Sequence, residues 1–346
     1  MSTKRFPGFI DVHVHLRDPG ATHKEDFTTG SRAAVKGGVT FMLDMPNNPI
    51  QTLSVKNLQD KIKSADEKAI CDIGFHYGTN GKNTDSFGEA ISNPRVYGLK
   101  LYCNHTTGEM LIEDLSLLEP VFRLWETDKP ILVHAEGTEL AATIGLARLY
   151  DRRLHVCHIT QAVEVELVRR AKERGQDITA GVCPHHLFMT EKDRAELKGY
   201  ATMKPPLGTQ TDQDGLWKGL LDRTIDIVET DHAPHTKEEK EANPPAFGVP
   251  GLETMVPLLF KAVKEKKMTQ ELLLEVIHDK PKEIFNIPEQ ADTYVELDPD
   301  KPWIVGSDGY ETKCGWSSFE GWELYGQPET VVIRGKKVME EGKIIV

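Results

Sequence analysis

The chain has 346 residues, of which 39% are hydrophobic and 28% charged, the usual composition of a soluble globular protein. Its 54 Asp and Glu outnumber its 42 Lys and Arg, and the net charge of −12 argues against a nucleic-acid-binding protein, which needs a basic surface. No apolar run approaches the ~20 residues of a membrane span, and the N-terminus lacks a signal-peptide pattern. Five Cys without a CxxC pair indicate a reducing compartment, so we expect a cytoplasmic protein.

Short apolar, β-branched runs alternate with amphipathic segments through the first two thirds of the chain. This alternation predicts βα units and a parallel sheet. Eight units in about 230 residues favour a closed (β/α)8 TIM barrel, of class α/β, over an open sheet. The predicted strands are Gly8–His15, Thr40–Met45, Cys71–Tyr77, Tyr97–Tyr102, Ile131–His134, His155–Ile159, Ile178–Cys183 and Ile225–Thr230. The predicted helices between them are Asp26–Lys36, Val55–Glu67, Leu115–Trp125, Leu140–Tyr150, Ala162–Arg174 and Gln213–Leu221.

The pattern changes after the eighth strand. Ala233–Pro250 contains four prolines and no regular period, which predicts a long loop of functional importance. Leu252–Val263 and Gln270–His278 have helical spacing, and Val331–Val346 is typical of a β-hairpin. We therefore expect the barrel over residues 7–287 and a C-terminal extension with a hairpin over residues 288–346.

Histidine and aspartate recur at the ends of the predicted strands, where the active sites of such barrels lie. The first strand ends in His13 and His15, and the strand period of two points both imidazoles into the barrel mouth. His134, His158 and Asp231 end the fifth, sixth and eighth strands. Each residue alone is as well explained by a core or capping role, but imidazole and carboxylate groups meeting at one place predict a site for zinc or a similar divalent ion.

Lys100, in the GLKLY segment of the fourth strand, leaves two interpretations open. It can be a surface lysine whose ammonium reaches solvent from a strand end. In a metal site an ammonium would repel the ion, so a functional role requires the amine to be converted to a carbamate, an anionic oxygen ligand.

Several longer motifs carry a resemblance to a known family. They are GFIDVHVHLRDPGATHKEDFTTGSRAAVKGGVT, DMPNN, GLKLY, LVHAE, VCHI, PHHLF and TDHAPHTKEEK with PGLETMVPLL. Together they resemble dihydroorotase of the amidohydrolase superfamily, most closely the dihydroorotase domain of the animal polyprotein that also carries carbamoyl-phosphate synthetase and aspartate transcarbamoylase. The match runs in order from Pro7 to about Pro288, and HLRDPG with THKED and DHAPHT with PGLET are its specific parts.

The resemblance implies an enzyme of pyrimidine biosynthesis that interconverts N-carbamoyl-L-aspartate and dihydroorotate. It also implies two Zn²⁺ ions bridged by carboxylated Lys100 and a hydroxide that attacks the cyclic amide, with Asp231 as general acid/base. The implied ligands of one ion are His13, His15 and Asp231, and those of the other are His134 and His158.

The resemblance further implies a set of substrate contacts. Arg17, on the same side of the chain as His15, offers a planar fork for the unreactive substrate carboxylate, although alone it would be taken for a surface ion pair. Thr106 matches a residue that closes over the substrate in relatives. The other implied contacts are Asn47, Lys204, His235, Phe247 and Gly248; alone, Asn47 would be a turn residue and His235 a loop residue.

Three positions depart from the animal domain. Lys204 replaces an Arg and loses its fork, and Thr107 replaces an aromatic residue beside Thr106. Gly181 replaces a Glu that a third metal would need, so we expect only two metals. His185 and His186 are then expected to be structural. Many relatives also have N-terminal strands that join the hairpin in a small β domain, which we expect to be reduced here because the chain starts at the first barrel strand.

Two alternatives remain. A hydantoinase, dihydropyrimidinase or allantoinase would share the metal site, but Arg17 with Asn47 favours a substrate that carries a carboxylate. A non-catalytic scaffold would have lost ligands, and none is lost. The resemblance is also compatible with a homodimer, and with a place in a pyrimidine-biosynthesis polyprotein or in a complex with aspartate transcarbamoylase.

Overall fold

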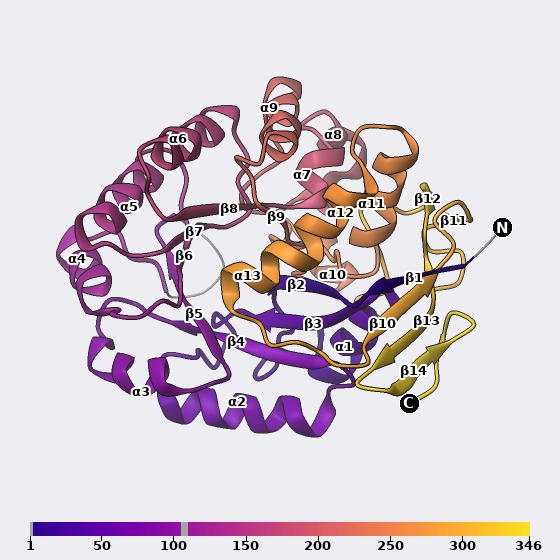
Figure 1. Ribbon diagram of the computed structural model, residues 1–346, viewed down its shortest axis with the longest axis horizontal. Helices are drawn as coiled ribbons and strands as arrows, with labels where there is room; N and C mark the ends of the chain where they lie inside the picture. The colour runs from indigo at the N-terminus through magenta and orange to yellow at the C-terminus, as the bar shows by residue number, and fades with distance from the viewer. Residues whose placement is uncertain (1–2, 105–109) are drawn as a thin grey trace.

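The computed structural model describes residues 3–104 and 110–346, and its centre is a barrel of eight parallel strands (Figure 1). The strands follow one another around the barrel in chain order. The first and last meet through a parallel bridge between Val14 and His232, and the His15 amide donates to the His232 carbonyl at 2.7 Å. The predicted (β/α)8 barrel is confirmed. Its strands are β2 (Phe9–Val14), β3 (Val39–Asp44), β4 (Asp72–Gly78), β5 (Val96–Tyr102), β6 (Ile131–His134), β7 (Leu154–Val156), β8 (Ile178–Val182) and β9 (Ile227–Val228).

The barrel strands are buried on both faces, which explains why they appear in the sequence as nearly continuous apolar runs. Every residue of β2 and β3 is buried. Successive side chains of β2, such as Phe9 and Ile10, belong to two different apolar clusters. Two predicted strands prove shorter than expected, because β7 ends at Val156 and β9 covers only Ile227–Val228. The residues that follow these two strands include His158 and Asp231. Their backbone is therefore not restricted to the β-strand conformation.

Helices surround the barrel, and Figure 1 shows α2 to α6 along its outer side. Local capping explains several of their starts: Asp26 accepts from the Thr29 amide at 2.9 Å, and Ser54 accepts from the Asn57 amide at 3.1 Å. No helix in the described ranges is long and apolar enough to cross a membrane. The helices are α1 (Phe27–Lys36), α2 (Val55–Lys68), α3 (Phe87–Ser92), α4 (Leu115–Leu124), α5 (Gly137–Tyr150), α6 (Ala162–Glu173), α7 (Pro184–Phe188), α8 (Asp193–Leu197), α9 (Gln210–Leu221), α10 (Lys237–Glu241), α11 (Met255–Lys264), α12 (Gln270–Leu274) and α13 (Lys280–Phe285), with short turns η1 (Thr84–Ser86), η2 (Lys198–Ala201) and η3 (Glu275–Asp279).

Two segments after the barrel differ from the prediction. The expected loop over 233–250 contains the short helix α10, which begins at Thr236 because its side chain and that of Glu239 form a capping box. The helix expected over 270–278 is α-helical only to Leu274 and continues as the π-helical turn η3. Both differences arise from local hydrogen bonds, which cannot be predicted from the spacing of apolar residues in the sequence.

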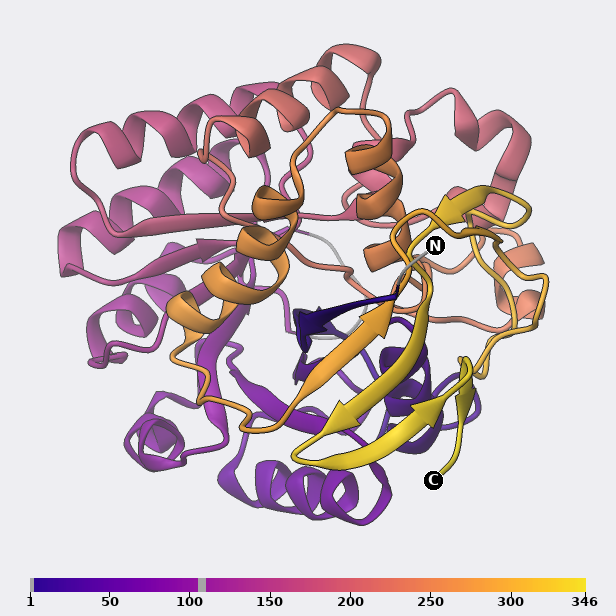
Figure 2. The same cartoon turned by 45° about the vertical axis from the view of Figure 1, so that its right-hand side comes forward.

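A second sheet corrects the expectation that the chain starts at the first barrel strand. Residues Lys4–Pro7 form strand β1, which pairs antiparallel with β10 (Tyr294–Leu297). In Figure 2 this indigo strand lies beside the orange and yellow strands of the C-terminal region. Phe6 is buried against Phe260 with ring centroids 5.5 Å apart, while Arg5 on the other face pairs with Glu296 at 2.9 Å. The remaining strands of this sheet are β13 (Pro328–Ile333), β14 (Lys336–Glu340) and β15 (Lys343–Ile344); β11 (Pro302–Ile304) and β12 (Glu323–Tyr325) form a separate pair.

The small β subdomain is thus more complete than predicted, since it unites both ends of the chain in five strands. The predicted hairpin is present as β13 and β14. The division of the chain into residues 7–287 and 288–346 stays a prediction.

Candidate active site

The predicted ligands converge at the carboxyl ends of the barrel strands, where they line a small cavity. The cavity is formed by side chains from six strand ends, by Lys204 between η2 and α9, and by the loop that follows β9. Its lining residues are His13, His15, Arg17, Asn47, Tyr102, His134, His158, Lys204, Asp231, Ala233, Phe247 and Gly248. Twelve of the thirteen residues predicted from the sequence line this cavity or contact its lining, and the thirteenth, Thr106, lies outside the described residues.

The first ligand group joins the end of β2 to Asp231, the third residue after β9. Nε2 of His15 lies 3.0 Å from Oδ1 of Asp231, and Nε2 of His13 lies 3.4 Å from the same oxygen. Nδ1 of His15 is 2.8 Å from Oδ1 of Asn47, and since this carbonyl oxygen can only accept, His15 carries its proton on Nδ1. The lone pair on Nε2 therefore faces a carboxylate oxygen, an arrangement that a cation held between the two atoms would stabilise.

Asn47 thus has a place that the resemblance did not specify. Its side chain lines the cavity and also orients His15 through the contact to Nδ1. Hydrogen bonds of this kind set the tautomer and ring orientation of metal-binding histidines.

The second ligand group is a pair of imidazoles from neighbouring strands. Nδ1 of His134, at the end of β6, faces Nε2 of His158, beyond β7, at 3.0 Å. His158 has a φ of 35° and Asp231 a φ of 48°, a region that non-glycine residues rarely adopt. The His158 backbone is held there by its amide, which donates to Glu229 Oε1 at 2.7 Å. Strained backbone of this kind is common where a structure must aim a side chain at a site.

Lys100 lies at the centre of the two groups, and the surface interpretation is excluded because the residue is completely buried. Its Nζ is 3.0 Å from Sγ of Cys157 and 5.0 Å from the ring centroid of Tyr102. Within the described ranges no carboxylate forms an ion pair with this amine. A buried ammonium without a counter-ion is costly, whereas a carbamate on the same stem would add an anion among the metal ligands.

The imidazoles are in the protonation state that metal binding requires. Burial, together with the Lys100 amine, lowers the pKa of His13 to about 4. Burial lowers the pKa of His15, His134 and His158 well below the ordinary imidazole value. Four neutral imidazoles, one carboxylate and one carbamate-forming lysine are a nitrogen and oxygen donor set that suits Zn²⁺, so the residues present fit the implied metal centre.

Glu229 is a site residue that the sequence analysis missed. It is fully buried, and its Oε2 lies 3.5 Å from Nδ1 of His13 and 3.6 Å from Nε2 of His155. Glu229 stands two residues before Asp231, so the strand period could have placed it on the same side of the chain. The carboxylate supports His13 from behind, opposite the nitrogen that faces Asp231.

The absence of a side chain at Gly181 makes room for Glu229. A Cβ at position 181 would lie 2.5 Å from Oε1 of Glu229, so the glycine leaves room for that carboxylate. The expectation of only two metals rested on the glycine at this position, and the structure places the carboxylate of Glu229, the first residue after β9, beside it. His13, Cys157 and Glu229 each offer a ligand atom within 4.8 Å of the others. The number of metals stays a prediction.

His185 and His186 belong to α7, as the structural role predicts. Nε2 of His186 donates to the Pro205 carbonyl at 3.1 Å, which anchors the segment that carries Lys204. Together with Cys183, the two histidines also form a buried group whose ligand atoms lie within 4.8 Å of one another.

Arg17 forms one wall of the cavity. Its φ is 61°, and the side chain is buried. Nε donates to the Pro234 carbonyl at 3.1 Å, and Nη2 donates to Nε2 of His235 at 3.1 Å. Burial, with the charges of Arg17 and Lys24, lowers the pKa of His235, so that its ring is neutral and can accept from the guanidinium. The surface ion pair considered for Arg17 is therefore excluded, and His235 acts as its partner.

Lys204, Phe247 and Gly248 form another wall of the cavity. Nζ of Lys204 is 5.0 Å from the ring centroid of Phe247. Gly248 has a φ of 129°, and a Cβ there would lie 2.4 Å from the Ala233 carbonyl oxygen, so only glycine fits this close approach. Thr106 and Thr107 lie outside the residues that the structure describes.

Comparison with known proteins agrees with this geometry. Residues 6–113 match the model of the amidohydrolase family. The chain is 42% identical over 345 residues to the multifunctional protein CAD of Squalus acanthias, covering 99% of this chain and 15% of that protein. It is 34% identical to a dihydroorotase of Lactobacillus acidophilus, covering 97% of this chain and 88% of that enzyme. The chain thus spans a small part of the multifunctional relatives and most of the bacterial ones.

Solved structures share the fold. An L-hydantoinase (dihydropyrimidinase) from Arthrobacter aurescens superimposes with a TM-score of 0.93 at 23% identity, covering 99% of this chain and 87% of that one. The inactive dihydroorotase-like domain of a CAD-like multifunctional protein from Chaetomium thermophilum superimposes with a TM-score of 0.84 at 26% identity, covering 100% and 97%. These likenesses establish the amidohydrolase barrel but leave the choice of substrate to the site.

Proposed function

Since the chain belongs to the dihydroorotase family of amidohydrolases, we propose that it catalyses the reversible conversion of N-carbamoyl-L-aspartate to (S)-dihydroorotate, a step of UMP synthesis. The observation that carries this proposal is the pairing of a complete ligand set with the buried guanidinium of Arg17 in one cavity. A buried arginine whose hydrogen-bond partners are a carbonyl and a neutral imidazole keeps its positive charge for an anionic ligand. Dihydroorotate carries such a carboxylate, and dihydrouracil and hydantoin do not.

The ligand set would hold two zinc ions. His13, His15 and Asp231 would bind one ion, His134 and His158 the other, and carboxylated Lys100 would serve both. When bound, zinc polarises an amide carbonyl and lowers the pKa of water, so that a nucleophile is available near neutral pH.

Asp231 is suited to move the proton in this reaction. Burial raises the pKa of its carboxyl group, which brings proton uptake closer to neutral pH. In ring opening, water adds to the amide carbon, Asp231 accepts the proton that the water loses, and the carboxyl group returns it to the ring nitrogen as the C–N bond breaks. Ring closure runs through the same positions in reverse.

The two walls of the cavity orient the substrate. Arg17, supported by His235, would bind the carboxylate, and Asn47 lies close enough to His15 to complete that pocket. Lys204 would bring a second positive charge, and the backbone at Phe247 and Gly248 would contact the ring. Thr106 would close over the substrate, as it is expected to do by resemblance. Arg17, Lys204 and the metal ions offset the net charge of −12 locally.

We also propose that the chain functions as a dihydroorotase unit in either of the settings its relatives represent. Some relatives are multifunctional proteins many times its length, and others are free-standing enzymes of similar length. A homodimer and an association with aspartate transcarbamoylase are further predictions, which light scattering of the pure protein, alone and mixed with that enzyme, would test.

Turnover of three cyclic amides by the zinc-loaded protein tests the function. We expect dihydroorotate to be opened with a kcat/KM at least about 10- to 100-fold above dihydrouracil and hydantoin, because only dihydroorotate engages Arg17. Closure of N-carbamoyl-L-aspartate should be favoured at acidic pH and opening at alkaline pH, since closure consumes a proton. Preference for dihydrouracil or hydantoin would establish a hydantoinase-type enzyme instead. A protein with two bound zinc ions and no turnover would support the scaffold alternative.

A further inference from the structure

We propose that Lys240 is a positioning residue that joins the two chain segments forming the Lys204–Phe247 wall, and that it thereby determines substrate affinity. The proposal rests on the proposed function, because it concerns the same substrate cavity. Lys240 lies in α10 and contacts none of the predicted metal ligands through its ammonium.

The ammonium of Lys240 is fully committed to three backbone carbonyls. Nζ donates to Thr202 O at 2.8 Å, Ala246 O at 2.7 Å and Gly248 O at 2.8 Å. An ammonium has three N–H bonds, and each finds an acceptor at near-ideal distance. The residue is only 1% exposed, so these bonds are shielded from water.

The three acceptors belong to the two segments that form one wall of the cavity. Thr202 precedes Lys204 by two residues, whereas Ala246 and Gly248 stand on either side of Phe247. Besides Lys240, the two segments are joined by the Gly248 amide, which donates to Thr202 O at 3.0 Å. The ammonium therefore reinforces the pairing of the two segments that bring Lys204 to the Phe247 ring.

Burial of this charge has an energetic cost that a purely apolar side chain would avoid. The described part of the chain offers Lys240 no carboxylate within ion-pair distance, and its other close neighbour is the Trp316 ring, with Nζ 5.6 Å from the centroid. Burial, with the charge of Arg17, lowers the pKa of Lys240 to about 7. Carbonyl dipoles and the Trp316 ring, without a carboxylate in ion-pair distance, compensate the ammonium, so its retention is best explained by the geometry it imposes on the carbonyls.

Helix α10 also connects to the part of the cavity wall that contains Arg17. α10 begins after Thr236, directly beyond His235, the partner of Arg17. The His235 carbonyl accepts from Nε1 of Trp316 at 2.8 Å. The short segment from His235 to Lys240 thus joins the partner of Arg17 to the ammonium that holds Ala246 and Gly248.

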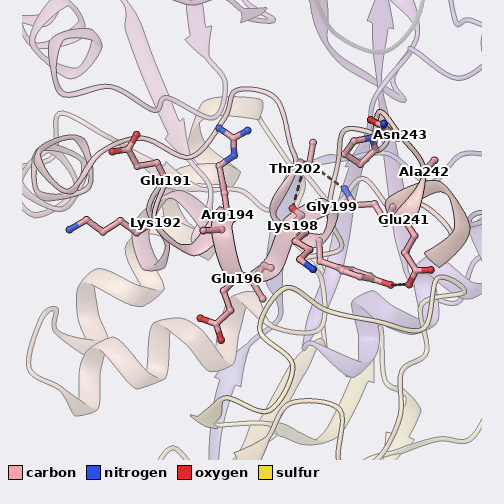
Figure 3. A pocket seen from close by; sticks show the side chains of 15 residues that line it. Glu191, Lys192, Arg194, Glu196, Lys198, Gly199, Thr202, Glu241, Ala242 and Asn243 are labelled. Carbon is pink, nitrogen blue, oxygen red and sulfur yellow. Dashed lines mark hydrogen bonds between the residues drawn. The ribbon is translucent and has the colours of Figure 1, made fainter.

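Lys240 is reachable from outside once its side chain is shortened. It lines a surface groove of about 1130 Å³ between α8, η2 and α10, together with Thr202, Gly199 and Pro245. Figure 3 shows this groove, with hydrogen bonds of the Thr202 region drawn as dashed lines. Truncation to alanine would therefore leave a cavity that a small alkylammonium ion can enter from the groove.

The test compares Lys240→Met and Lys240→Ala with Lys237→Ala, an exposed lysine of the same helix. We expect Lys240→Met to raise KM for dihydroorotate by about 10- to 100-fold while kcat changes much less, because the displaced wall touches parts of the substrate that do not react. Zinc content should equal that of the wild type. Ethylammonium should lower the KM of Lys240→Ala and leave that of Lys237→Ala unchanged.

Three outcomes would overturn the proposal. They are an unchanged KM in both Lys240 variants, a fall in kcat and zinc content without a change in KM, and a KM of Lys240→Ala that ethylammonium does not lower. If Lys240→Ala is insoluble, Lys240→Met, which keeps the length of the stem, decides by its KM alone. Inactivity of the zinc-loaded wild type would instead contradict the proposed function, so the two failures are distinct.

Discussion

Gly181 on β8 and Glu229, the first residue after β9, lie so close that a single methyl group at position 181 would be 2.5 Å from the Glu229 carboxylate. That carboxylate holds the His158 amide at 2.7 Å and faces Nδ1 of His13 at 3.5 Å. A small residue on β8 is therefore a condition for the arrangement of two predicted metal ligands on other strands.

Gly181→Ala should destabilise the protein and weaken metal binding. Glu229 is fully buried and cannot swing away without losing the His158 amide, so we expect a loss of about 1–3 kcal/mol in the free energy of unfolding. Denaturant unfolding and zinc analysis would measure both effects. Gly145→Ala is the matched control, because no atom lies within 4 Å of the added Cβ on helix α5, and it should be neutral or stabilising by up to about 1 kcal/mol. A Gly181→Ala protein with wild-type stability and zinc content would contradict the role assigned to Glu229.

Lys100→Ala should remove the metal ions and the activity while the barrel still folds. Lys100 is the residue predicted to bind both ions. Its side chain is buried, but the strands around it hold their own packing when it is shortened. Zinc analysis, circular dichroism and turnover are the measurements, with exposed Lys63→Ala as the control. Metal-depleted wild type should also recover faster with bicarbonate present, since the carbamate forms from carbon dioxide. Normal metal content and rate in Lys100→Ala would exclude the carbamate.

Arg17→Gln should discriminate between substrates. Loss of a charged donor to the substrate carboxylate should lower kcat/KM for dihydroorotate by about 10- to 100-fold, because hydrogen bonds to charged groups contribute about 1.5–3 kcal/mol. Any slow turnover of dihydrouracil should change little, since that ring has no carboxylate. Exposed Arg148→Gln on α5 serves as the control. An equal loss of kcat/KM for both substrates would indicate that Arg17 shapes the cavity without binding the substrate carboxylate.

Glu253→Gln should alter how stability depends on pH. Burial raises the pKa of Glu253 from 4.5 to about 8, against the lowering effect of the Thr312 and Glu311 amides that donate to it. The folded protein therefore binds a proton that the unfolded chain has released, and this contribution to stability is lost as pH rises from about 4.5 through about 8.

We expect the free energy of unfolding of the wild type to fall more steeply between pH 5 and about 8.5 than that of Glu253→Gln, so that the variant is the more stable protein at the alkaline end. Urea unfolding at several pH values measures the two slopes, and Glu67→Gln, exposed on α2, should follow the wild type. Parallel slopes for Glu253→Gln and wild type would show that the carboxyl group ionises at its ordinary pKa.

The predicted metal ligands were accessible to sequence reasoning because each is tied to a local pattern. A strand period of two aligned His13 with His15, and the place of His134 at the end of an apolar run marked the barrel mouth. The substrate contacts were named only through resemblance, since Asn47 and His235 stand in irregular segments without a period. The structure then assigned them specific partners, His15 and Arg17.

Other features escaped the sequence analysis because their partners are remote in the chain. Strand β1 is too short to be identified alone, and it is stabilised by β10, nearly the whole chain away. Lys240 appears in the sequence as one charge in a polar run, and only folding brings Thr202 and Gly248 to its ammonium. Surface and interior lysines have the same local sequence signature, so the burial of Lys100 was also undecided.

By itself the sequence determined the alternation of strands and helices, the closed barrel and the end of the barrel at which the histidines meet, because these follow from short periods and from the topology of βα units. The tertiary structure alone decided which charges share a buried space: Glu229 beside Gly181, His235 beside Arg17, and the Lys240 ammonium among three carbonyls. The reason is that electrostatic and steric contacts depend on distance in space, and the chain fixes that distance only after its remote segments have packed.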